Sequence, residues 1–171
     1  PKGVGALYVR RSPNVKVQQQ IHGGGHERGM RSGTLATHQI VGFAKAAALI
    51  IESLESEIAH NRQLRDRLWQ GIEGFGVKRN SHESRFSPNH LNVSFTGVDG
   101  EILLASLAQL AVSSGSACNS ASIAPSYVLK ALGMPDELAH AGIRFSVGRY
   151  TTEEDIDFTV TEIKRVLSAL R

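Results

Sequence analysis

The sequence predicts a fold between the α/β and α+β classes. Apolar residues recur at helical spacing in residues 52–72 and again in residues 156–170, which predicts two amphipathic helices. Residues 90–95 instead alternate between apolar and polar side chains, which is the period of a half-buried strand. Short strands and helices alternate through the second half of the chain, and this order indicates a two-layer α+β unit.

The first part of the chain predicts two strands followed by a helix. Residues 4–9 and 15–21 have strand composition, and turn-forming residues 11–14 separate them. Two strands alone bury too little to be stable, so we expect them to pack on something else. Residues 37–51 predict a helix rich in alanine and isoleucine. Thr34 opens this helix in our interpretation, since a threonine is a favoured N-cap.

A change of composition at residues 51–53 predicts a domain boundary. The small-residue helix before it gives way to the more charged helix 52–72. We therefore expect residues 1–51 to belong to one domain, without a core of its own, and residues 52–171 to form a second. In the second helix, the apolar residues predict a buried face and the charged residues a solvated face. Trp69 is expected in the core. The apolar positions are Leu54, Ile58, Leu64, Leu68 and Ile72, and the charged ones are Glu55, Glu57, Arg62, Arg65 and Arg67.

The remaining elements follow from turn formers and capping residues. Polar residues 77–88 predict a surface loop, and residues 151–154 read as a capping box that opens the last helix. In order, we expect a strand at 90–95, a helix at 99–109, a strand at 111–113, helical turns at 125–132 and 135–141, a strand at 143–147 and the C-terminal helix.

Composition excludes several classes of protein. With 171 residues, 41% hydrophobic and 20% charged, the chain is typical of a globular protein rather than a disordered one. The net charge of +3 is spread over the sequence, without the basic stripe of a nucleic-acid-binding protein. No apolar run is long enough to span a membrane, and we recognise no signal peptide. One cysteine excludes an internal disulfide and fits a reducing compartment, so we expect a cytoplasmic location.

That cysteine, Cys118, lies among small and polar residues at 113–122. A structural cysteine usually packs among bulky apolar side chains, whereas serine, glycine, alanine and asparagine are typical of a solvated loop. A thiol on such a loop can move to meet a partner. Composition alone leaves two interpretations open, a reactive nucleophile and a surface cysteine without a function.

A second stretch, residues 22–34, combines five glycines with two histidines and two arginines. Glycines let the backbone approach a ligand, and arginine supplies a fixed positive charge for a carboxylate or phosphate. The stretch predicts a phosphate site ending at Thr34, although it matches neither the Walker pattern nor GxGxxG. The alternative is a flexible connection with incidental charges.

These same motifs resemble those of the IscS/NifS-type cysteine desulfurases. The resemblance rests on residues 22–34 (HGGGHERGMRSGT), on 113–118 (SSGSAC) with 125–129 (PSYVL), and on 143–154 (IRFSVGRYTTEE). It covers essentially the whole chain. It implies an aminotransferase-like fold of type I, with residues 1–51 at the end of the large domain and 52–171 as the small C-terminal domain. The chain is then the C-terminal portion of such an enzyme.

The resemblance also implies an activity. Enzymes of this family are homodimers that use pyridoxal 5'-phosphate to take sulfur from L-cysteine and release L-alanine. The sulfur stays on the loop cysteine as a persulfide and passes to an iron–sulfur scaffold or another acceptor. A thiolate is the nucleophile that this chemistry needs. A transient [2Fe-2S] cluster shared with the scaffold could also involve Cys118 as a ligand.

Three residues match the family's functional positions. Cys118 matches the persulfide carrier, Thr34 the threonine that binds the cofactor phosphate across the dimer, and Arg144 the arginine that grips the substrate carboxylate. For Arg144 the alternative is a structural ion pair at a strand end. Four further residues match less distinctly and could equally be structural: His22, His26, Arg28 and Arg31.

The resemblance places the lysine that binds pyridoxal phosphate outside this sequence, and Lys2 is not its counterpart. We therefore expect the isolated chain to be inactive. Asn119 stands where threonine or serine is more usual. The competing interpretations are a cofactor-free sulfur carrier or docking module that uses Cys118 alone, an inert structural fragment, and a selenocysteine lyase.

Overall fold

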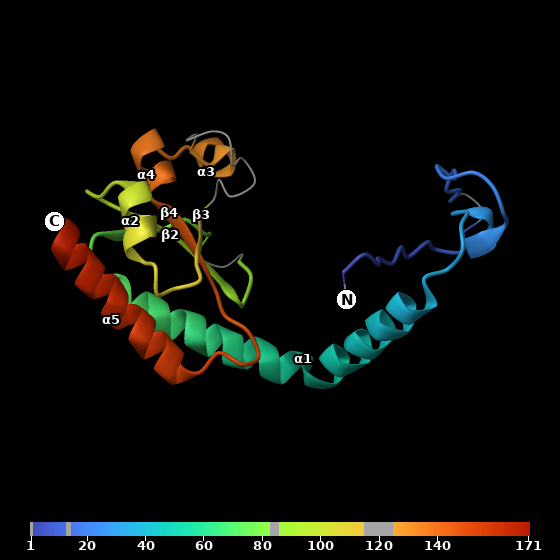
Figure 1. Ribbon diagram of the computed structural model, residues 1–171, viewed down its shortest axis with the longest axis horizontal. Coiled ribbons are helices and arrows are strands. Elements are labelled where there is room, and N and C mark those ends of the chain that lie inside the picture. Colours follow the sequence, from blue (N-terminus) through green and yellow to red (C-terminus); the bar gives the residue numbers. More distant parts are fainter. Residues whose placement is uncertain (1, 13–14, 83–85, 115–124) are drawn as a thin grey trace. The chain divides into compact units, whose positions relative to one another are not determined.

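The computed structural model describes residues 2–12, 15–82, 86–114 and 125–171. The chain divides into two compact units, Pro1–Leu54 and Glu55–Arg171, and each is described here by itself. Figure 1 labels the helices and strands. Their order is η1 (His26–Gly29), α1 (Thr37–Ile72), β1 (Val77–Arg79), β2 (His90–Phe95), α2 (Gly100–Ser106), β3 (Ser113–Ser114), α3 (Tyr127–Ala131), α4 (Asp136–His140), β4 (Gly142–Ser146) and α5 (Glu153–Leu170).

The first unit contains no strand among its described residues, so the two strands predicted at 4–9 and 15–21 are wrong. Leu7 and Tyr8 are 75% and 87% exposed, and no neighbouring strand pairs with them. A strand needs a partner for its backbone groups and a surface for its side chains. The composition of these segments is right for strands, but the residues that the structure describes do not supply that partner.

Helix α1 is continuous from Thr37 to Ile72, where the sequence predicted two helices meeting near residue 52. The residues at the predicted junction include neither glycine nor proline, so nothing interrupts the backbone hydrogen bonds. The Ser53 hydroxyl donates to the Leu49 carbonyl across it, at 3.0 Å. Thr34 does not open the helix, because the helix begins three residues later at Thr37.

The second unit is built on a four-stranded antiparallel sheet in the order β1-β2-β4-β3. Five residue pairs join β2 to β4, from His90 opposite Ser146 to Ser94 opposite Gly142. On the other side of β4, Ser113 of β3 is opposite Arg144. The strand predicted at 90–95 is confirmed, and that predicted at 143–147 is displaced by one residue.

Strand β1 lies inside the segment that was predicted as a surface loop. Val77, the first residue of β1, is opposite Phe95 of β2, and both side chains are buried. Residues 77–79 include two basic side chains, and three residues are too few to show the alternation of apolar and polar side chains that indicates a strand. The pairing with β2 therefore decides the conformation of this segment, which its own composition does not reveal.

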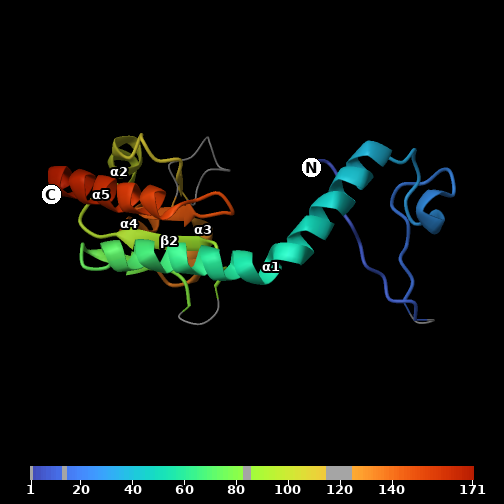
Figure 2. The ribbon, with the colours of Figure 1, turned by 90° about the horizontal axis from the view of Figure 1, so that it is seen from below.

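Helices α1 and α5 pack on one face of the sheet and enclose the core of the second unit (Figures 1 and 2). The core includes Leu64, Leu68 and Ile72 of α1 and Ile156, Ile163, Val166 and Leu167 of α5. The sheet contributes Val77, Leu91, Val93, Phe95, Ile143 and Phe145. Trp69, expected in the core, is half-buried and packs against it.

The ends of the helices follow from local capping. The Asp99 side chain accepts hydrogen bonds from the backbone N–H groups of Glu101 and Ile102, and so begins α2. A capping box opens α5, but it pairs Thr152 with Asp155 and is therefore one residue later than predicted. In the described part of the chain, no helix is long and apolar enough to cross a membrane.

Candidate functional site

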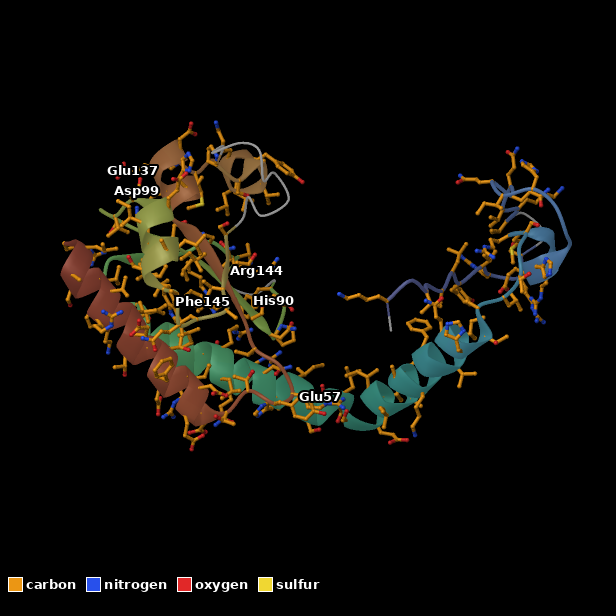
Figure 3. The ribbon with its side chains drawn as sticks, in the orientation of Figure 1. Glu57, His90, Asp99, Glu137, Arg144 and Phe145 are labelled. Atoms are coloured by element: carbon orange, nitrogen blue, oxygen red, sulfur yellow. The ribbon has the colours of Figure 1, made fainter. Side chains whose placement is uncertain are left out.

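The two faces of the sheet in the second unit differ in chemistry. Phe145 of β4 is 5% exposed and points into the core, whereas the neighbouring Arg144 is exposed on the opposite face. Figure 3 labels both side chains. Because alternate residues share a face, His90 and Asn92 of β2 lie on the same face as Arg144. This polar face of the sheet is our candidate site.

The cross-strand neighbours of Arg144 use their own polar groups elsewhere. Asn92, directly opposite on β2, accepts a hydrogen bond at Oδ1 from Asn80 at 2.7 Å. Ser113, directly opposite on β3, donates from its hydroxyl to the Ser114 carbonyl at 3.3 Å. Neither neighbour therefore holds the guanidinium of Arg144.

Among the described residues, no carboxylate forms an ion pair with Arg144. The alternative role of Arg144, a structural ion pair at a strand end, thus finds no partner in that part of the chain. An exposed guanidinium offers five N–H donors in a planar arrangement that fits a carboxylate at two points. The arrangement is chemically suited to bind an acid from solution.

The turn that follows β4 is fastened to α1. Arg149 forms an ion pair with Glu57, and this hydrogen bond together with the charge of Glu57 raises the pKa of Arg149. His60 of α1 contacts the Thr151 carbonyl at 3.1 Å, and the Gly148 N–H donates to the Thr151 hydroxyl at 3.0 Å. These contacts hold the turn after β4 to α1 and so fix the end of the strand that carries Arg144. Figure 3 also labels Glu57.

Cys118 lies outside the described residues, so its predicted role is untested. Strand β3, which the sequence predicted at residues 111–113, is placed at Ser113–Ser114. Ser113 and Ser114 pair with Arg144 and Ile143 of β4. The stretch that contains Cys118 therefore starts from the strand beside Arg144.

Thr34 lies in the first unit and is exposed. The preceding segment has several left-handed backbone positions, including two residues that are not glycine, Glu27 (φ 50°) and Arg28 (φ 57°). This conformation costs a non-glycine residue free energy. The residues that nevertheless adopt it are concentrated at functional sites. At Gly23, a Cβ would lie 2.6 Å from the Ser32 hydroxyl oxygen, so the close backbone approach there needs glycine.

The segment 22–34 exposes groups that can donate hydrogen bonds, and the phosphate site that its composition predicts stays a prediction. Arg28 and Arg31 are exposed, and Arg31 donates only a long hydrogen bond, 3.4 Å, to the Gly33 carbonyl. The hydroxyl of Thr34, the two guanidiniums and the N–H groups of the glycines are donors of the kind that bind the phosphate group of pyridoxal phosphate. His22 accepts at Nδ1 from Gln19 at 3.1 Å, and His26 is exposed. The roles of His22, His26, Arg28 and Arg31 remain predictions.

Sequence reasoning missed His90. It lies at the start of β2, half-buried, with its Nδ1 atom 3.0 Å from the Ser87 hydroxyl. The available signal was its place in the strand alternation, which puts His90, Asn92 and Arg144 on one face once β2 and β4 are paired. Only the register supplies that pairing.

A hollow lies beside the end of β4. It is bordered by Leu68 of α1, Phe145 of β4, Val147 directly after this strand, and Ile156 and Thr159 of α5. Most of its lining is apolar and belongs to the edge of the core. In the described residues, no group of three or more histidine, cysteine or acidic side chains could hold a metal ion.

Comparison with known proteins identifies the family. The sequence profile described as aminotransferase class V matches residues 1–158. The chain belongs to the aminotransferase class V family. The resemblance to the IscS/NifS-type cysteine desulfurases found in the motifs is confirmed by this family match and by the relatives described next.

Individual relatives within the class V family are more specific. The chain is 58% identical over 172 aligned residues to the cysteine desulfurase IscS of Klebsiella pneumoniae (strain 342), covering all of this chain and 43% of that protein. IscS of Salmonella paratyphi C (strain RKS4594) gives the same identity and coverage. This class V chain therefore spans less than half the length of the curated relatives that it matches. The comparisons do not support the expectation that it is their C-terminal portion.

Solved structures of class V proteins agree with the fold. A NifS-like protein superposes with a TM-score of 0.80 at 34% identity, over 95% of this chain and 42% of that one. A NifS-like protein from Rickettsia africae ESF-5 superposes with a TM-score of 0.79 at 26% identity, over 91% of this chain and 41% of that one. The similarity therefore includes both units of the chain.

Proposed function

We propose that this chain is part of a pyridoxal-phosphate-dependent cysteine desulfurase. The observation that carries the proposal is the 58% identity, along the whole chain, to proteins named cysteine desulfurase IscS. The reaction removes sulfur from L-cysteine, releases L-alanine and leaves a persulfide on Cys118. The cofactor supplies an electron sink that activates the substrate. Its lysine lies outside this chain, so the isolated chain is expected to be inactive.

In this proposal Arg144 orients the substrate by binding its carboxylate. The support is its exposed guanidinium, which has no acidic partner among the described residues. Cys118 then attacks the substrate sulfur as a thiolate: the new S–S bond forms, the substrate C–S bond breaks, and the carbon takes the electron pair and a proton.

Chain length alone allows Cys118 to work near Arg144. Cys118 is four positions after Ser114 in the sequence, and an extended chain spans at most about 3.6 Å per residue. A stretch of this length reaches at most about 14 Å from the Cα atom of Ser114, which pairs with the neighbour of Arg144 on β4.

Thr34, with Arg28 and Arg31 nearby, would hold the cofactor phosphate in a homodimer, each subunit contributing to the partner's site. The persulfide would pass to an iron–sulfur scaffold or another acceptor, with Cys118 as a ligand of a transient [2Fe-2S] cluster. A cytoplasmic location follows from the same proposal. The support for the phosphate site is the cluster of donors and glycines in residues 22–34.

The test uses the full-length protein that contains this chain, loaded with pyridoxal phosphate. Supplied with L-cysteine, it should release alanine and carry a persulfide that mass spectrometry locates on Cys118. Cys118→Ala should abolish the persulfide, whereas Ser120→Ala, a change in the same stretch, should not. Arg144→Gln should raise KM for L-cysteine about 10- to 100-fold, since it removes charge-assisted hydrogen bonds worth about 1.5–3 kcal/mol.

Three results would contradict the proposal. Persulfide that persists in the Cys118→Ala protein would refute the assigned carrier. Sulfur uptake by this chain alone, from a donor other than cysteine and without pyridoxal phosphate, would favour the cofactor-free sulfur carrier. Exclusive activity on selenocysteine would favour the selenocysteine lyase.

A further inference from the structure

His90 is a diagonal neighbour of Arg144 on the polar face of the sheet, and the proposed function gives it no role. Ser146 is directly opposite His90, and Arg144 is two residues before Ser146 on the same strand. Diagonal neighbours of this kind in an antiparallel pair lie about 7–8 Å apart, within reach of long side chains. Figure 3 shows the two labelled side chains near each other.

Hydrogen bonds determine which nitrogen of His90 carries the proton. The Ser87 hydroxyl donates to Asn89 Oδ1, so its oxygen is left to accept. His90 Nδ1 lies 3.0 Å from that oxygen and therefore donates to it. In a neutral imidazole the other nitrogen, Nε2, is then a hydrogen-bond acceptor. Nε2 has no hydrogen bond to any residue in the described ranges.

The group that orients His90 is itself fixed from the interior. Arg65 of α1 is 2% exposed and donates from Nη1 to the Ser87 carbonyl at 3.2 Å. The same guanidinium bonds Asp66 and stacks 4.1 Å from the centre of the Phe86 ring. A chain of contacts thus runs from a buried arginine through Ser87 to the His90 ring.

We infer that His90 is a second substrate-contacting residue, whose Nε2 accepts a hydrogen bond from a donor group of the amino acid that Arg144 binds by its carboxylate. The inference rests on the proposed function of Arg144. In the tautomer that Ser87 selects, Nε2 has no proton to give to a carboxylate. Its partner must therefore be an N–H or S–H group, and L-cysteine carries both.

The first experiment compares variants of the full-length holoenzyme. His90→Phe removes the acceptor and should raise KM for L-cysteine about tenfold, the effect of one lost hydrogen bond, with kcat changed less than twofold. His90→Gln retains an amide oxygen and should recover most of the loss. Ser87→Ala, which frees the ring, should give an intermediate KM. His140→Phe, an exposed histidine of α4, is the matched control and should behave as wild type.

Circular dichroism shows whether each variant is folded. Unchanged KM in both folded His90 variants would overturn the inference. A decrease in kcat without a change in KM would also overturn the inference. A contact made equally in the ground state and the transition state affects KM, not kcat, when it is lost.

A second experiment does not depend on activity. With 15N-labelled histidine in the holoenzyme, the Nε2 resonance of His90 should shift when L-cysteine is added, and not in the Arg144→Gln protein. L-alanine, which has the ammonium but no thiol, distinguishes the two donors. If the holoenzyme does not desulfurate cysteine yet the resonance shifts with amino acids, the proposed function fails and this inference stands. A resonance that responds to neither amino acid overturns the inference.

Discussion

Arg67 joins the two helices that cover the core. Its guanidinium donates to both carboxylate oxygens of Asp157 on α5, each at 2.8 Å, and lies 3.1 Å from Glu153. The hydrogen bond from Arg67 lowers the pKa of Asp157 below the ordinary carboxyl value, and the same bond raises the pKa of Arg67. Two-point contact of this kind fixes the relative position of the two helices more firmly than a single contact.

This pair gives a stability that depends on pH. A carboxyl group whose pKa is lower in the folded state stabilises the fold above its ordinary pKa of about 3.9 and loses this effect as the pH falls through the lowered value. Asp157→Asn should therefore unfold at lower urea than wild type at pH 7, and the difference should shrink and vanish in acid. Urea titrations over this pH range measure it.

Glu55→Gln on α1 is the matched control, because Glu55 is exposed and forms no ion pair among the described residues. It should leave the urea midpoint unchanged at every pH. A difference between Asp157→Asn and wild type that persists at the acid end would show that the ion pair is not its source.

Two arginines show what sequence can predict for a single residue. The sequence placed Arg65 on the solvated face of α1, yet it is 2% exposed. Its partners in that position, Phe86 and the Ser87 carbonyl, come from a segment about twenty residues away, so local periodicity cannot reveal them. Arg144 was found through the motif around it, and its exposed position on the polar face needed the strand register.

Helices α1 and α5 approach each other closely at Gly71. A Cβ atom on this residue would lie 2.5 Å from Cγ2 of Val160, far inside van der Waals contact. The position therefore requires a glycine because of the neighbouring helix, although glycine in a helix costs about 1 kcal/mol relative to alanine. The contact sets the distance between two elements of the helix layer.

Gly71→Ala should destabilise the protein by about 1–3 kcal/mol, because the strain of overpacking outweighs the better helix propensity. Adding Val160→Ala should recover part of the loss, so that the two changes together cost less than their sum. Gly74→Ala is the matched control, since no atom lies within 4 Å of its Cβ position. Urea unfolding compares wild type with Gly71→Ala, Val160→Ala, the double variant and Gly74→Ala, and additive effects of the Gly71 and Val160 changes would contradict the contact.

Helices and strands with a strong apolar periodicity of their own were predictable from the sequence, and those without it were not. Strand β2 alternates clearly and α5 has a broad apolar face, and both were predicted closely. Strand β1 depends on pairing with β2, and the N-terminal segments with strand composition have no partner strand in the part of the chain that the structure describes. Local propensity determined the conformation of β2 and α5. Long-range pairing determined the conformation of β1, and the lack of such pairing left the described N-terminal segments without strand structure.

The buried hydrophobic residues are distributed very unevenly over the whole molecule. All of them in the described ranges lie between Leu64 and Leu167, within the unit Glu55–Arg171. In the first unit, Val41 and Ile51 are 68% and 74% exposed. The predicted boundary at 51–53 lies close to the division between Leu54 and Glu55. The assignment of these units to large and small enzyme domains stays a prediction.

This distribution predicts that the two units differ in their ability to fold alone. Residues 55–171, expressed separately, contain the whole described core and should unfold cooperatively in urea. Residues 1–54, which bury no hydrophobic side chain among those described, should show little structure by circular dichroism. A chain starting at Glu73 removes Leu64, Leu68 and Ile72 and should fail to fold. A non-cooperative transition for residues 55–171 would show that the core needs the first unit, contrary to the contacts that the structure describes.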